Sequence, residues 1–409
     1  MKIAYASILP ANDVNSWSGL NLHIADCLRA QGAEVHLLPP LHDAKLATFS
    51  KIKALTRRII TGKRHLWTRD ARLLRAYGRR LGEALAKVDC DLVFSPGTEP
   101  LAHLPASETR PVAFWTDAPF AAMSGYYAWY QNLADRSLAD GLSCDALALG
   151  RSSLAIYSSD WAADAARQAH GLSPEKVAVV PFGANLEPNL QTDQLATCIA
   201  ERLQPPWRFL FVGVEWERKG GPKAVETVAE LNRRGYPSEL VVVGCQPPAS
   251  SLPLPGFVHL EGFLSKRTEA GRQRLAELYR TSLFFLMPAL AEAYGIVFCE
   301  ANAHGVPCLS TATGGIPTII HHGENGFLFA PDAVASEIAE KILQFIRPLA
   351  YTRLSEVSLG SYQERLNWRS SGTRLMQLLE ETLHPSPTHL SLPPASIPPE
   401  PVALTLPVT

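Results

Sequence analysis

Residues 287–329 contain the pattern that most restricts how this chain can fold. The apolar segments 282–288 and 306–312 predict buried strands, and the sequence between them is compatible with a short helix at 296–305. Gly305 is a residue type that commonly ends a helix. A strand, a loop, a helix and a second strand in this order form the repeating unit of an α/β sheet. The stretch therefore predicts an α/β fold.

Two carboxylates flank the predicted start of this helix. Glu292 lies in the loop, and Glu300 lies one turn inside the helix, with Gly295 between them. A helix N-terminus presents unpaired N–H groups and a partial positive charge, which suit a phosphate. Carboxylates on either side of a phosphate site are suited to hydroxyl groups. The combination predicts a ligand that is both phosphorylated and polyhydroxylated.

The length and composition fit two ordered domains. A chain of 409 residues exceeds one typical domain, and 46% hydrophobic residues are enough to form cores. The formal net charge of −1 argues against a dedicated nucleic-acid-binding protein. Seven dispersed cysteines without a CxxC motif predict reduced, buried thiols and no metal site. The sequence start and the lack of a run of about 18 apolar residues predict a cytoplasmic protein without a signal peptide or membrane span.

Predicted strands and helices alternate in two series, which indicates two doubly wound, Rossmann-like α/β domains. The first domain spans 1–190 and the second 206–365, with the connection placed at 186–207 because the composition shifts there. A helix at 366–383 is expected to pack back toward the first domain, and the proline-rich residues 384–409 to lie outside the fold. The predicted strands of the two series are 2–7, 34–39, 91–96, 111–117, 154–159 and 177–183, then 208–213, 239–244, 257–262, 282–288 and 306–312.

Three features of the first half could contact a ligand. Gly19 lies in the loop before the first predicted helix, where a nucleotide-binding fold approaches its ligand closely, although a plain turn explains it equally well. Asp117 ends the strand 111–117, at the edge where open α/β sheets bind ligands, or it caps the segment that follows. Four aromatic residues within 126–130 could stack on a sugar ring, although helix packing is the commoner use of such a cluster.

Residues 51–80 form a strongly basic segment. They carry eleven Lys or Arg and a single acid, Asp70, and the surrounding sequence 45–87 is helical in composition. Apolar residues such as Leu55 and Ile59 interleave with the cations. The simplest interpretation is a solvated helical face. The alternative is docking to an anionic membrane surface or an anionic acceptor, which would place the protein at the inner membrane face.

A second phosphate-directed feature lies in the second half. Arg218 and Lys219 come directly before two glycines, at the predicted start of a helix that follows the strand 208–213. Adjacent cations at a glycine-rich helix start suit a phosphate, although an exposed pair at a turn would look the same. Cations and a helix N-terminus can together neutralise a leaving diphosphate without a metal. Combined with the Glu292 stretch, the pair favours a phosphate site built from two loops.

Other catalytic motifs have little support. Asp89 and Asp91 form a DxD pattern, but they immediately precede a predicted buried strand, so we interpret them as a turn at its start. His321 and His322 lack partners at metal-ligand spacing. The P-loop, GxGxxG and GxSxG motifs do not occur, which leaves P-loop NTPases, Rossmann dehydrogenases and serine hydrolases without motif support.

The stretch from Glu292 to Glu300, with the sequences FCEANAHGVPCLSTATGGIPTII and GENGFLF, resembles the signature of the retaining family-4 glycosyltransferases of the GT-B fold. The segments VPFGAN, YSSDWAA and VGVEWERKGG and the pair Gly314-Gly315 are similar to that family. The match is dense from about 154 to 330 and weak before it. The resemblance implies two Rossmann-like domains that face each other across a cleft.

The resemblance also implies roles for individual residues. Glu300 would bind the ribose of a nucleotide, and Glu292 would contact hydroxyls of the donor sugar. Lys219 matches the family's phosphate-binding lysine, and Arg218 would substitute for an arginine whose position is taken here by Val214. The base would lie near Phe263 and Leu264, and the amides of Gly295, Ile296 and Val297 would bind the diphosphate. Gly19, Gly213 and Tyr294 are the remaining implied donor contacts.

Asp117 stands where many members of the family have a histidine near the reacting carbon. It therefore joins Glu292, Arg218 and Lys219 as a candidate catalytic residue.

The implied activity is transfer of a sugar, with retention of configuration, from a UDP- or GDP-sugar to a hydroxyl of a glycan, a lipid or a small molecule, without a metal or other cofactor. The second domain would bind the donor and the first the acceptor. The leaving phosphate would help to take the acceptor proton, since no enzymic nucleophile is obvious. Two alternatives remain: a nucleotide-sugar epimerase or phosphorylase of the same fold, and a non-catalytic scaffold that binds a nucleotide-sugar or a membrane.

Overall fold

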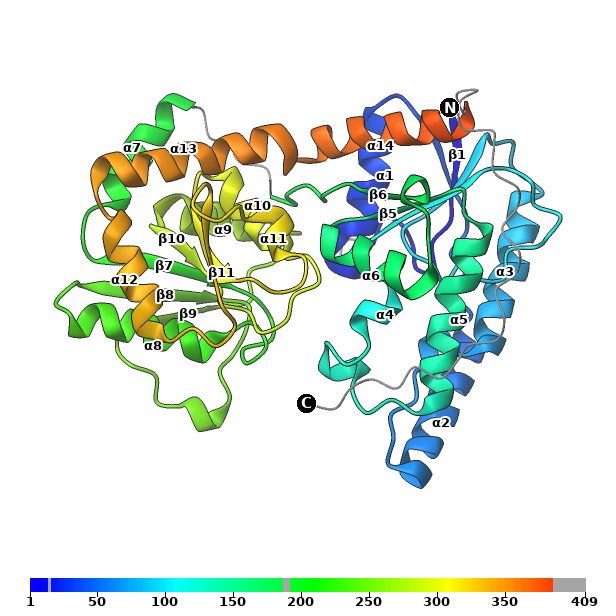
Figure 1. Cartoon of the computed structure of the whole chain (residues 1–409), viewed down its shortest axis with the longest axis horizontal. Coiled ribbons are helices and arrows are strands. Elements are labelled where there is room, and N and C mark those ends of the chain that lie inside the picture. The colour runs from blue at the N-terminus through cyan, green and yellow to red at the C-terminus, as the bar shows by residue number, and fades with distance from the viewer. Residues whose placement is uncertain (14–15, 187–191, 385–409) are drawn as a thin grey trace.

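The computed structural model describes residues 1–13, 16–186 and 192–384. These residues form two α/β units that lie side by side (Figure 1). Each unit is built on a six-stranded sheet in which the paired strands run parallel. The predicted fold of two doubly wound α/β sheets is confirmed.

The first unit has the strand order β2-β1-β3-β4-β5-β6. Its strands are β1 (Lys2–Tyr5), β2 (Glu34–Leu37), β3 (Leu92–Ser95), β4 (Val112–Thr116), β5 (Leu154–Tyr157) and β6 (Val177–Val179). Its helices are α1 (Leu20–Ala30), α2 (Ala44–Thr61), α3 (Ala71–Leu85), α4 (Phe120–Met123), α5 (Asp135–Arg151) and α6 (Asp160–His170). The chain leaves β1 toward one edge of the sheet and β3 toward the other, so the crevice between β1 and β3 is the place where such sheets bind ligands.

The second unit has the strand order β12-β11-β10-β7-β8-β9. Its strands are β7 (Trp207–Val212), β8 (Ser238–Val243), β9 (Val258–Gly262), β10 (Phe284–Leu286), β11 (Cys308–Thr311) and β12 (Gly326–Phe329). Its helices are α7 (Thr192–Arg202), α8 (Gly221–Arg233), α9 (Glu269–Thr281), α10 (Ile296–Ala303), α11 (Ile316–Ile319) and α12 (Ala335–Phe345). The chain leaves β7 and β10 in opposite directions, so the crevice of this sheet lies between the two loops predicted to bind phosphate.

The inner strands bury both faces, as helices on each side of a parallel sheet require, whereas the edge strands β2 and β9 are partly exposed. In β1, Ile3 and Tyr5 join the core that contains Ile24 of α1, whereas Ala4 joins the core that contains Leu73 of α3. Side chains alternate between the two faces of a strand, so one strand serves two cores. All seven cysteines lie buried and unpaired, in agreement with the prediction of buried thiols.

The connection between the two sheets includes a helix. The segment 186–207, where we placed the connection between the domains, contains the helix α7. Leu195, Cys198 and Ile199 of α7 are buried, which is the spacing of one helix face. Arg202 at its end is also buried, and its guanidinium donates to the carbonyls of His304 and Gly305, each at 2.7 Å. The helix therefore packs on the second unit.

Two long helices, α13 (Pro348–Arg365) and α14 (Trp368–Leu383), run across both units along the top of Figure 1. α13 packs on α10 in the second unit, and α14 packs on α1 in the first. The chain thus crosses between the units twice, once after β6 and once between α13 and α14. The two crossings are in contact, because the Ala184 amide donates to the Leu366 carbonyl at 3.0 Å. Gly183 is needed there, because a Cβ would lie 2.2 Å from the Trp368 nitrogen. The predicted proline-rich tail lies outside the described residues beyond His384.

The predicted domain limits, 1–190 and 206–365, remain predictions, and each sheet lies within one of them. Among the described helices, none combines the length and the apolar composition needed to cross a bilayer.

Candidate functional site

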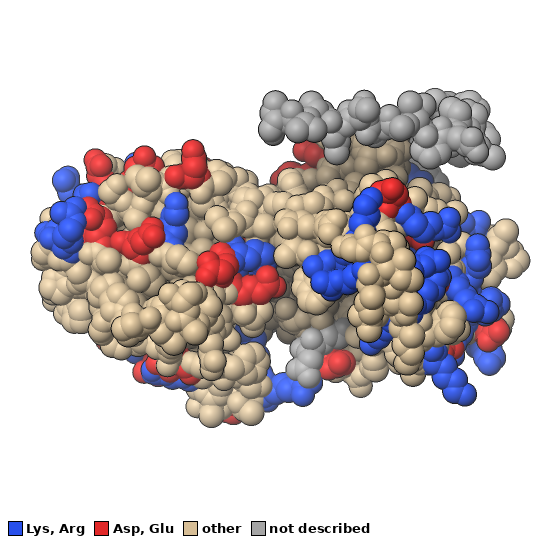
Figure 2. All heavy atoms as spheres, turned by 90° about the horizontal axis from the view of Figure 1, so that it is seen from below, with Lys and Arg blue, Asp and Glu red and all other residues tan. Residues whose placement is uncertain are grey.

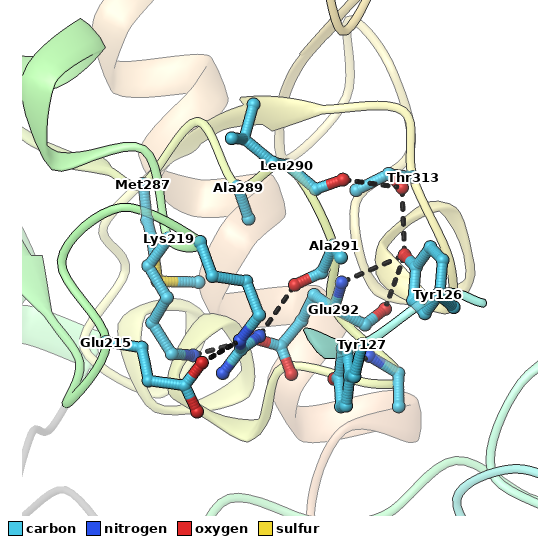
Figure 3. Close-up of polar contacts among 12 residues, drawn as sticks. Tyr126, Tyr127, Glu215, Lys219, Met287, Ala289, Leu290, Ala291, Glu292 and Thr313 are labelled. Carbon is cyan, nitrogen blue, oxygen red and sulfur yellow. Dashed lines mark hydrogen bonds and ion pairs between the residues drawn. The ribbon is translucent and has the colours of Figure 1, made fainter. Parts of the chain in front are cut away.

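The two loops predicted to bind phosphate meet at Glu292 (Figure 3). Glu292 lies between β10 and α10, and Arg218 and Lys219 lie between β7 and α8. The Lys219 Nζ lies 2.6 Å from the Glu292 Oε2, and the Arg218 Nη1 lies 3.3 Å from the same oxygen. Arg218 also donates to the carbonyl of Ala291 at 2.6 Å and to Glu215 at 2.6 Å. Residues distant in sequence therefore form one charged cluster at the crevice of the second sheet.

The cluster keeps Glu292 ionised. The Glu292 residue is only 8% exposed. Burial alone raises the pKa of its carboxyl, but the charges of Lys219 and Arg218 outweigh this, so the pKa lies below its usual range. The two cations expected to face a phosphate are paired with the carboxylate expected to face a sugar. A phosphate near Lys219 would therefore compete with Glu292 for the same ammonium group.

Glycines allow the loops to approach this closely. Gly314 has φ +52°, and a Cβ there would lie 1.9 Å from the Glu292 carbonyl oxygen. The adjacent Gly315 donates from its amide to the same carbonyl at 3.1 Å. Gly220 has φ +78°, and a Cβ would lie 2.0 Å from the Pro288 carbonyl. These positions exclude larger side chains because backbone occupies the space.

Glu300 lies one turn into α10 and is fully buried. Its carboxylate forms an ion pair with Lys266 and accepts a hydrogen bond from the Tyr279 hydroxyl at 3.2 Å. Sequence reasoning missed Lys266, although it lies three positions after Phe263. One turn later, at the end of α10, the buried ring of His304 packs on Tyr279. Burial lowers the pKa of His304 to about 4. Glu300 therefore has its own partners, Lys266 and Tyr279, which differ from those of Glu292.

The predicted helix start is present. Gly295 has φ +95° and precedes α10, whose first turn contains the half-buried Ile296 and Val297. Gly213 follows β7 and lies against the stem of Lys219, since a Cβ would meet its Cδ at 2.3 Å. These glycine and backbone positions all lie around the charged cluster.

Three other predicted donor contacts lie apart from the charged cluster or face away from it. The Tyr294 side chain is buried and its hydroxyl donates to the Phe182 carbonyl at 2.6 Å, so it joins the two units. Phe263 is 74% exposed, and Leu264 packs on the core. These two residues follow β9 at the edge of the sheet.

Across the cleft, Asp117 follows the central strand β4 of the first unit. The Trp17 indole Nε1 donates to its carboxylate at 3.1 Å. Burial raises the pKa of Asp117 from 3.8 to about 6, and the Trp17 hydrogen bond opposes this rise. The alternative that Asp117 caps the next helix is wrong, because Pro119 holds the N-cap position of α4. Gly19, with φ +82°, begins α1 two residues after Trp17.

Asp117 lines a cavity of about 260 Å³ within the first unit. The cavity opens over the β1–β3 crevice and is bordered by Trp17, Glu99 and Tyr130. Sequence reasoning did not identify Glu99 or the buried Arg69 that lies beside it. Both lack a local motif, and only the sheet topology brings their loops together.

Two tyrosines of the first unit hold the Glu292 loop of the second (Figure 3). The Tyr126 hydroxyl accepts from the Glu292 amide at 2.9 Å, and the Tyr127 hydroxyl accepts from the Ala293 amide at 2.7 Å. The Arg218 guanidinium lies over the Tyr127 ring, 4.6 Å from its centroid. Both residues lie between α4 and a short 3₁₀ turn, and the expected helix packing is present for Tyr126, whose ring lies 5.0 Å from that of Trp161 in α6. Through these hydrogen bonds the two tyrosines connect the first unit to the second.

The residues considered for metal binding have other partners. The Lys2 ammonium pairs with Asp89 at 2.6 Å, and the Lys2 amide donates to Asp91 at 2.7 Å. These contacts fit the interpretation of a turn before β3. His321 lies 3.4 Å from Glu324. In the described part of the chain, no group of three or more His, Cys, Asp or Glu side chains has the arrangement of a metal site.

Comparison with known proteins gives matches in both units. Residues 206–347 match the family model described as glycosyl transferases group 1, and residues 20–188 match the model described as glycosyltransferase family 4. A D-inositol 3-phosphate glycosyltransferase of Streptomyces bingchenggensis is 25% identical over 247 residues, covering 58% of this chain and 54% of the relative. A sucrose synthase of Denitrovibrio acetiphilus is 36% identical over 115 residues, covering 26% of this chain and 14% of the relative. The chain thus spans about half or less of the length of these curated relatives.

Solved structures share the fold. Anabaena HepE, solved with UDP and glucose, has a TM-score of 0.62 and 16% identity, with 93% of this chain and 100% of that chain covered. Sucrose-phosphate synthase from Thermosynechococcus elongatus has a TM-score of 0.67 and 17% identity, with 93% and 98% covered. At these identities the likeness shows the GT-B arrangement of two α/β units. With both units matched by the family models, the chain belongs to the group 1 glycosyltransferases.

Proposed function

We propose that this protein transfers a sugar, with retention of configuration and without a metal, from a nucleoside-diphosphate sugar to an acceptor hydroxyl. The contact of Lys219 and Arg218 with Glu292, in the loop before α10, carries the proposal. It combines phosphate-binding cations with a carboxylate suited to sugar hydroxyls. UDP or UDP-glucose is bound by HepE, a solved protein of the same fold, which favours a UDP-sugar over a GDP-sugar as donor.

In this proposal the donor lies across the crevice of the second sheet. The diphosphate binds Arg218, Lys219 and the amides of the first turn of α10, at Gly295 to Val297. Glu292 then contacts sugar hydroxyls. Glu300 exchanges Lys266 for the ribose hydroxyls. The base lies near Phe263 and Leu264, and Gly213 leaves room for the stem of Lys219 beside the phosphates.

The chemistry is a substitution at the anomeric carbon. The bond from this carbon to the phosphate oxygen breaks, and a bond to the acceptor oxygen forms on the same face. The acceptor proton passes to the leaving phosphate. Lys219 and Arg218 stabilise the charge that grows on this phosphate, in a site closed off from water. Glu292 holds the sugar, and no step of this transfer uses it as a nucleophile.

The acceptor lies in the cavity of the first unit, where Asp117 faces the Glu292 loop. A glycan or a lipid-linked sugar would suit this placement. WaaG, a solved neighbour with a TM-score of 0.59, is involved in lipopolysaccharide biosynthesis. Asp117 would accept a hydrogen bond from the acceptor and orient its attacking hydroxyl.

The proposal extends to contact with an anionic membrane surface through α2. Apolar side chains along its solvent side are 50% to 78% exposed, namely Phe49, Ile52, Leu55, Ile59 and Ile60. Figure 2 shows Lys and Arg side chains gathered on the same face of the first unit. An exposed apolar stripe beside cations suits the interface of an anionic bilayer. With its buried free thiols, the protein would then act in the cytoplasm, at the inner membrane face.

A screen of UDP-, GDP- and ADP-sugars by thermal shift tests the donor proposal. We expect one nucleotide class to raise the melting temperature, and the Lys219→Ala variant to lose this shift. Product analysis with that donor, with and without acceptors, then separates the enzyme classes. Conversion of the donor sugar without any acceptor would indicate an epimerase, and binding without conversion would indicate a scaffold.

A further inference from the structure

The cavity of the first unit lies at the carboxyl ends of β1, β3 and β4. Trp17 comes from the loop after β1, Glu99 from the loop after β3 and Asp117 from the end of β4. The crevice between β1 and β3 is the binding position of a doubly wound sheet. Met123 and Tyr130 line the cavity, and the segment between them bonds to the Glu292 loop through Tyr126 and Tyr127. We therefore take it as the acceptor cavity of the proposed function, and the inference below rests on that function.

Arg69 is the one cation among the described residues that line this cavity, and it is ion-paired with Asp145 and Glu99. Its Nη1 lies 2.6 Å from the Asp145 Oδ1 and 3.4 Å from the Gly141 carbonyl. Its Nη2 lies 3.0 Å from the Glu99 carboxylate. The guanidinium also stacks over the Phe120 ring, at 5.0 Å. An arginine held on several sides has few donors left to offer a ligand.

Asp145 is a buried structural anchor. It is 1% exposed, and its oxygens accept from the Thr98 hydroxyl at 2.8 Å and from the Phe120 amide at 2.6 Å, in addition to Arg69. It therefore cannot turn away and release Arg69 for a ligand. The arrangement fixes Arg69 in place and balances its charge from behind the cavity wall.

Two carboxylates remain at the cavity surface. Glu99 shares Arg69 with Asp145, and its side chain is 24% exposed. Asp117 has the Trp17 indole as its partner and no cation within ion-pair distance among the described residues. Arg69 carries one positive charge, whereas Glu99, Asp117 and Asp145 carry three negative charges. The net charge at the cavity is therefore negative. Tyr130 and Trp17 add aromatic ring surface.

We infer that the acceptor is a neutral, polyhydroxylated ring that carries no phosphate. Hydroxyl groups donate to carboxylates, and the ring of a sugar stacks on aromatic faces. A phosphate would instead meet carboxylates without a free cation, which costs free energy through repulsion and lost hydration. The chain would then differ from its D-inositol 3-phosphate glycosyltransferase relatives in the charge of its acceptor.

Matched pairs of probes test the inference: myo-inositol against myo-inositol 1-phosphate, and glucose against glucose 6-phosphate. Their affinities are measured by ligand-observed NMR on the full chain at pH 7.5, saturated with the nucleotide found by thermal shift. We expect the neutral member of at least one pair to bind about tenfold or more tightly than its phosphate ester. Tighter binding of the phosphate esters would overturn the inference, and so would binding of neither member.

Variants assign the preference to the cavity. Glu99→Gln and Asp117→Asn keep the shape of the side chains and remove negative charge, so the preference for the neutral probe should fall by about tenfold in the double variant. Asp164→Asn, an exposed position on α6, serves as the control and should leave it unchanged. Nucleotide binding distinguishes failure of this inference from failure of the proposed function. If the protein binds no nucleotide, the proposed function is refuted. If it binds nucleotide but prefers the phosphorylated probes, only this inference is refuted.

Discussion

The hydroxyl of Tyr127 accepts a 2.7 Å hydrogen bond from the amide of Ala293, which joins the first unit to the residue next to Glu292. Tyr126 makes the equivalent bond to the Glu292 amide and also contacts the Thr313 hydroxyl at 2.8 Å. The segment that carries these tyrosines also supplies Met123 and Tyr130 to the acceptor cavity. One short segment therefore contacts both halves of the proposed reaction.

Replacing these tyrosines tests whether they position Glu292. Tyr127→Phe and Tyr126→Phe keep the rings and remove the acceptor oxygens. We expect kcat for transfer to fall by about 3- to 10-fold in each variant, the value of one neutral hydrogen bond, while the nucleotide affinity set by Lys219 is kept. Steady-state kinetics and nucleotide titration separate the two effects. Tyr236→Phe, distant from the site on Trp207, is the matched control. An unchanged kcat, or tighter nucleotide binding, would argue against positioning.

The contact between Lys219 and Glu292 predicts a coupled effect on stability. Lys219→Met leaves the buried Glu292 with only Arg218, so we expect a loss of about 1–3 kcal/mol in the free energy of unfolding. Glu292→Gln should abolish transfer and cost less stability, because the amide still accepts from Lys219. The double variant should lose less than the sum of the two single losses, as measured by chemical denaturation. Additive losses would show that the pair is not coupled.

The raised pKa of Asp117 predicts a pH dependence of activity. If the ionised carboxylate orients the acceptor, kcat/KM for the acceptor rises as the pH increases through about 6. Asp117→Asn should show low activity without this step. A profile with the same step in the variant would assign it to another group.

The same group predicts a pH dependence of stability. The pKa of Asp117 is higher in the folded chain than its reference value of 3.8, so the folded state binds more protons between about pH 4 and 6. Its contribution to the free energy of unfolding is therefore greatest below this window and is lost as the pH rises through about 6. Denaturation curves should show Asp117→Asn gaining stability relative to the parent chain as the pH rises from 4 to 7.

The exposed stripe of α2 predicts membrane binding. Vesicle sedimentation should show binding that requires anionic lipid and weakens with added salt, because the Debye length shortens. Ile59→Glu with Ile60→Glu should reduce binding strongly, since both side chains are more than three quarters exposed, at 78% and 77%. Stability should change by less than about 0.5 kcal/mol, as for other surface positions. Equal binding to neutral vesicles would contradict the proposal, and Val334→Glu, exposed on the other unit, is the control.

Much of the second unit could be predicted because its signals are local. The strands around 287–329 are continuous apolar runs, and the special backbone of Gly220 and Gly295 lies at the predicted helix starts. The loops of Arg218 and Glu292 follow neighbouring central strands, so their meeting follows from the fold class. Lys266 was missed because its partner, Glu300, lies on a different element and no motif links them.

Prediction failed where contacts between distant elements decide the structure. Nothing near Tyr126 in the sequence shows that its hydroxyl reaches an amide of residue 292, 166 positions later. The helices α5 and α7 were also missed, because small and polar residues interrupt their apolar faces. Arg69 and Asp145 are 76 positions apart, so the charge balance of the cavity emerges only in the folded chain.

The contact between the two crossings, at Ala184 and Leu366, has a mechanical consequence. Because both covalent crossings meet at this one place, the two units can rotate about it as about a hinge. The separation then grows with distance from the pivot, so the tyrosine contacts on Glu292 and Ala293 would break before the packing around Trp368 is disturbed. Donor entry and product exit would thus open the far rim of the cleft and leave its back shut.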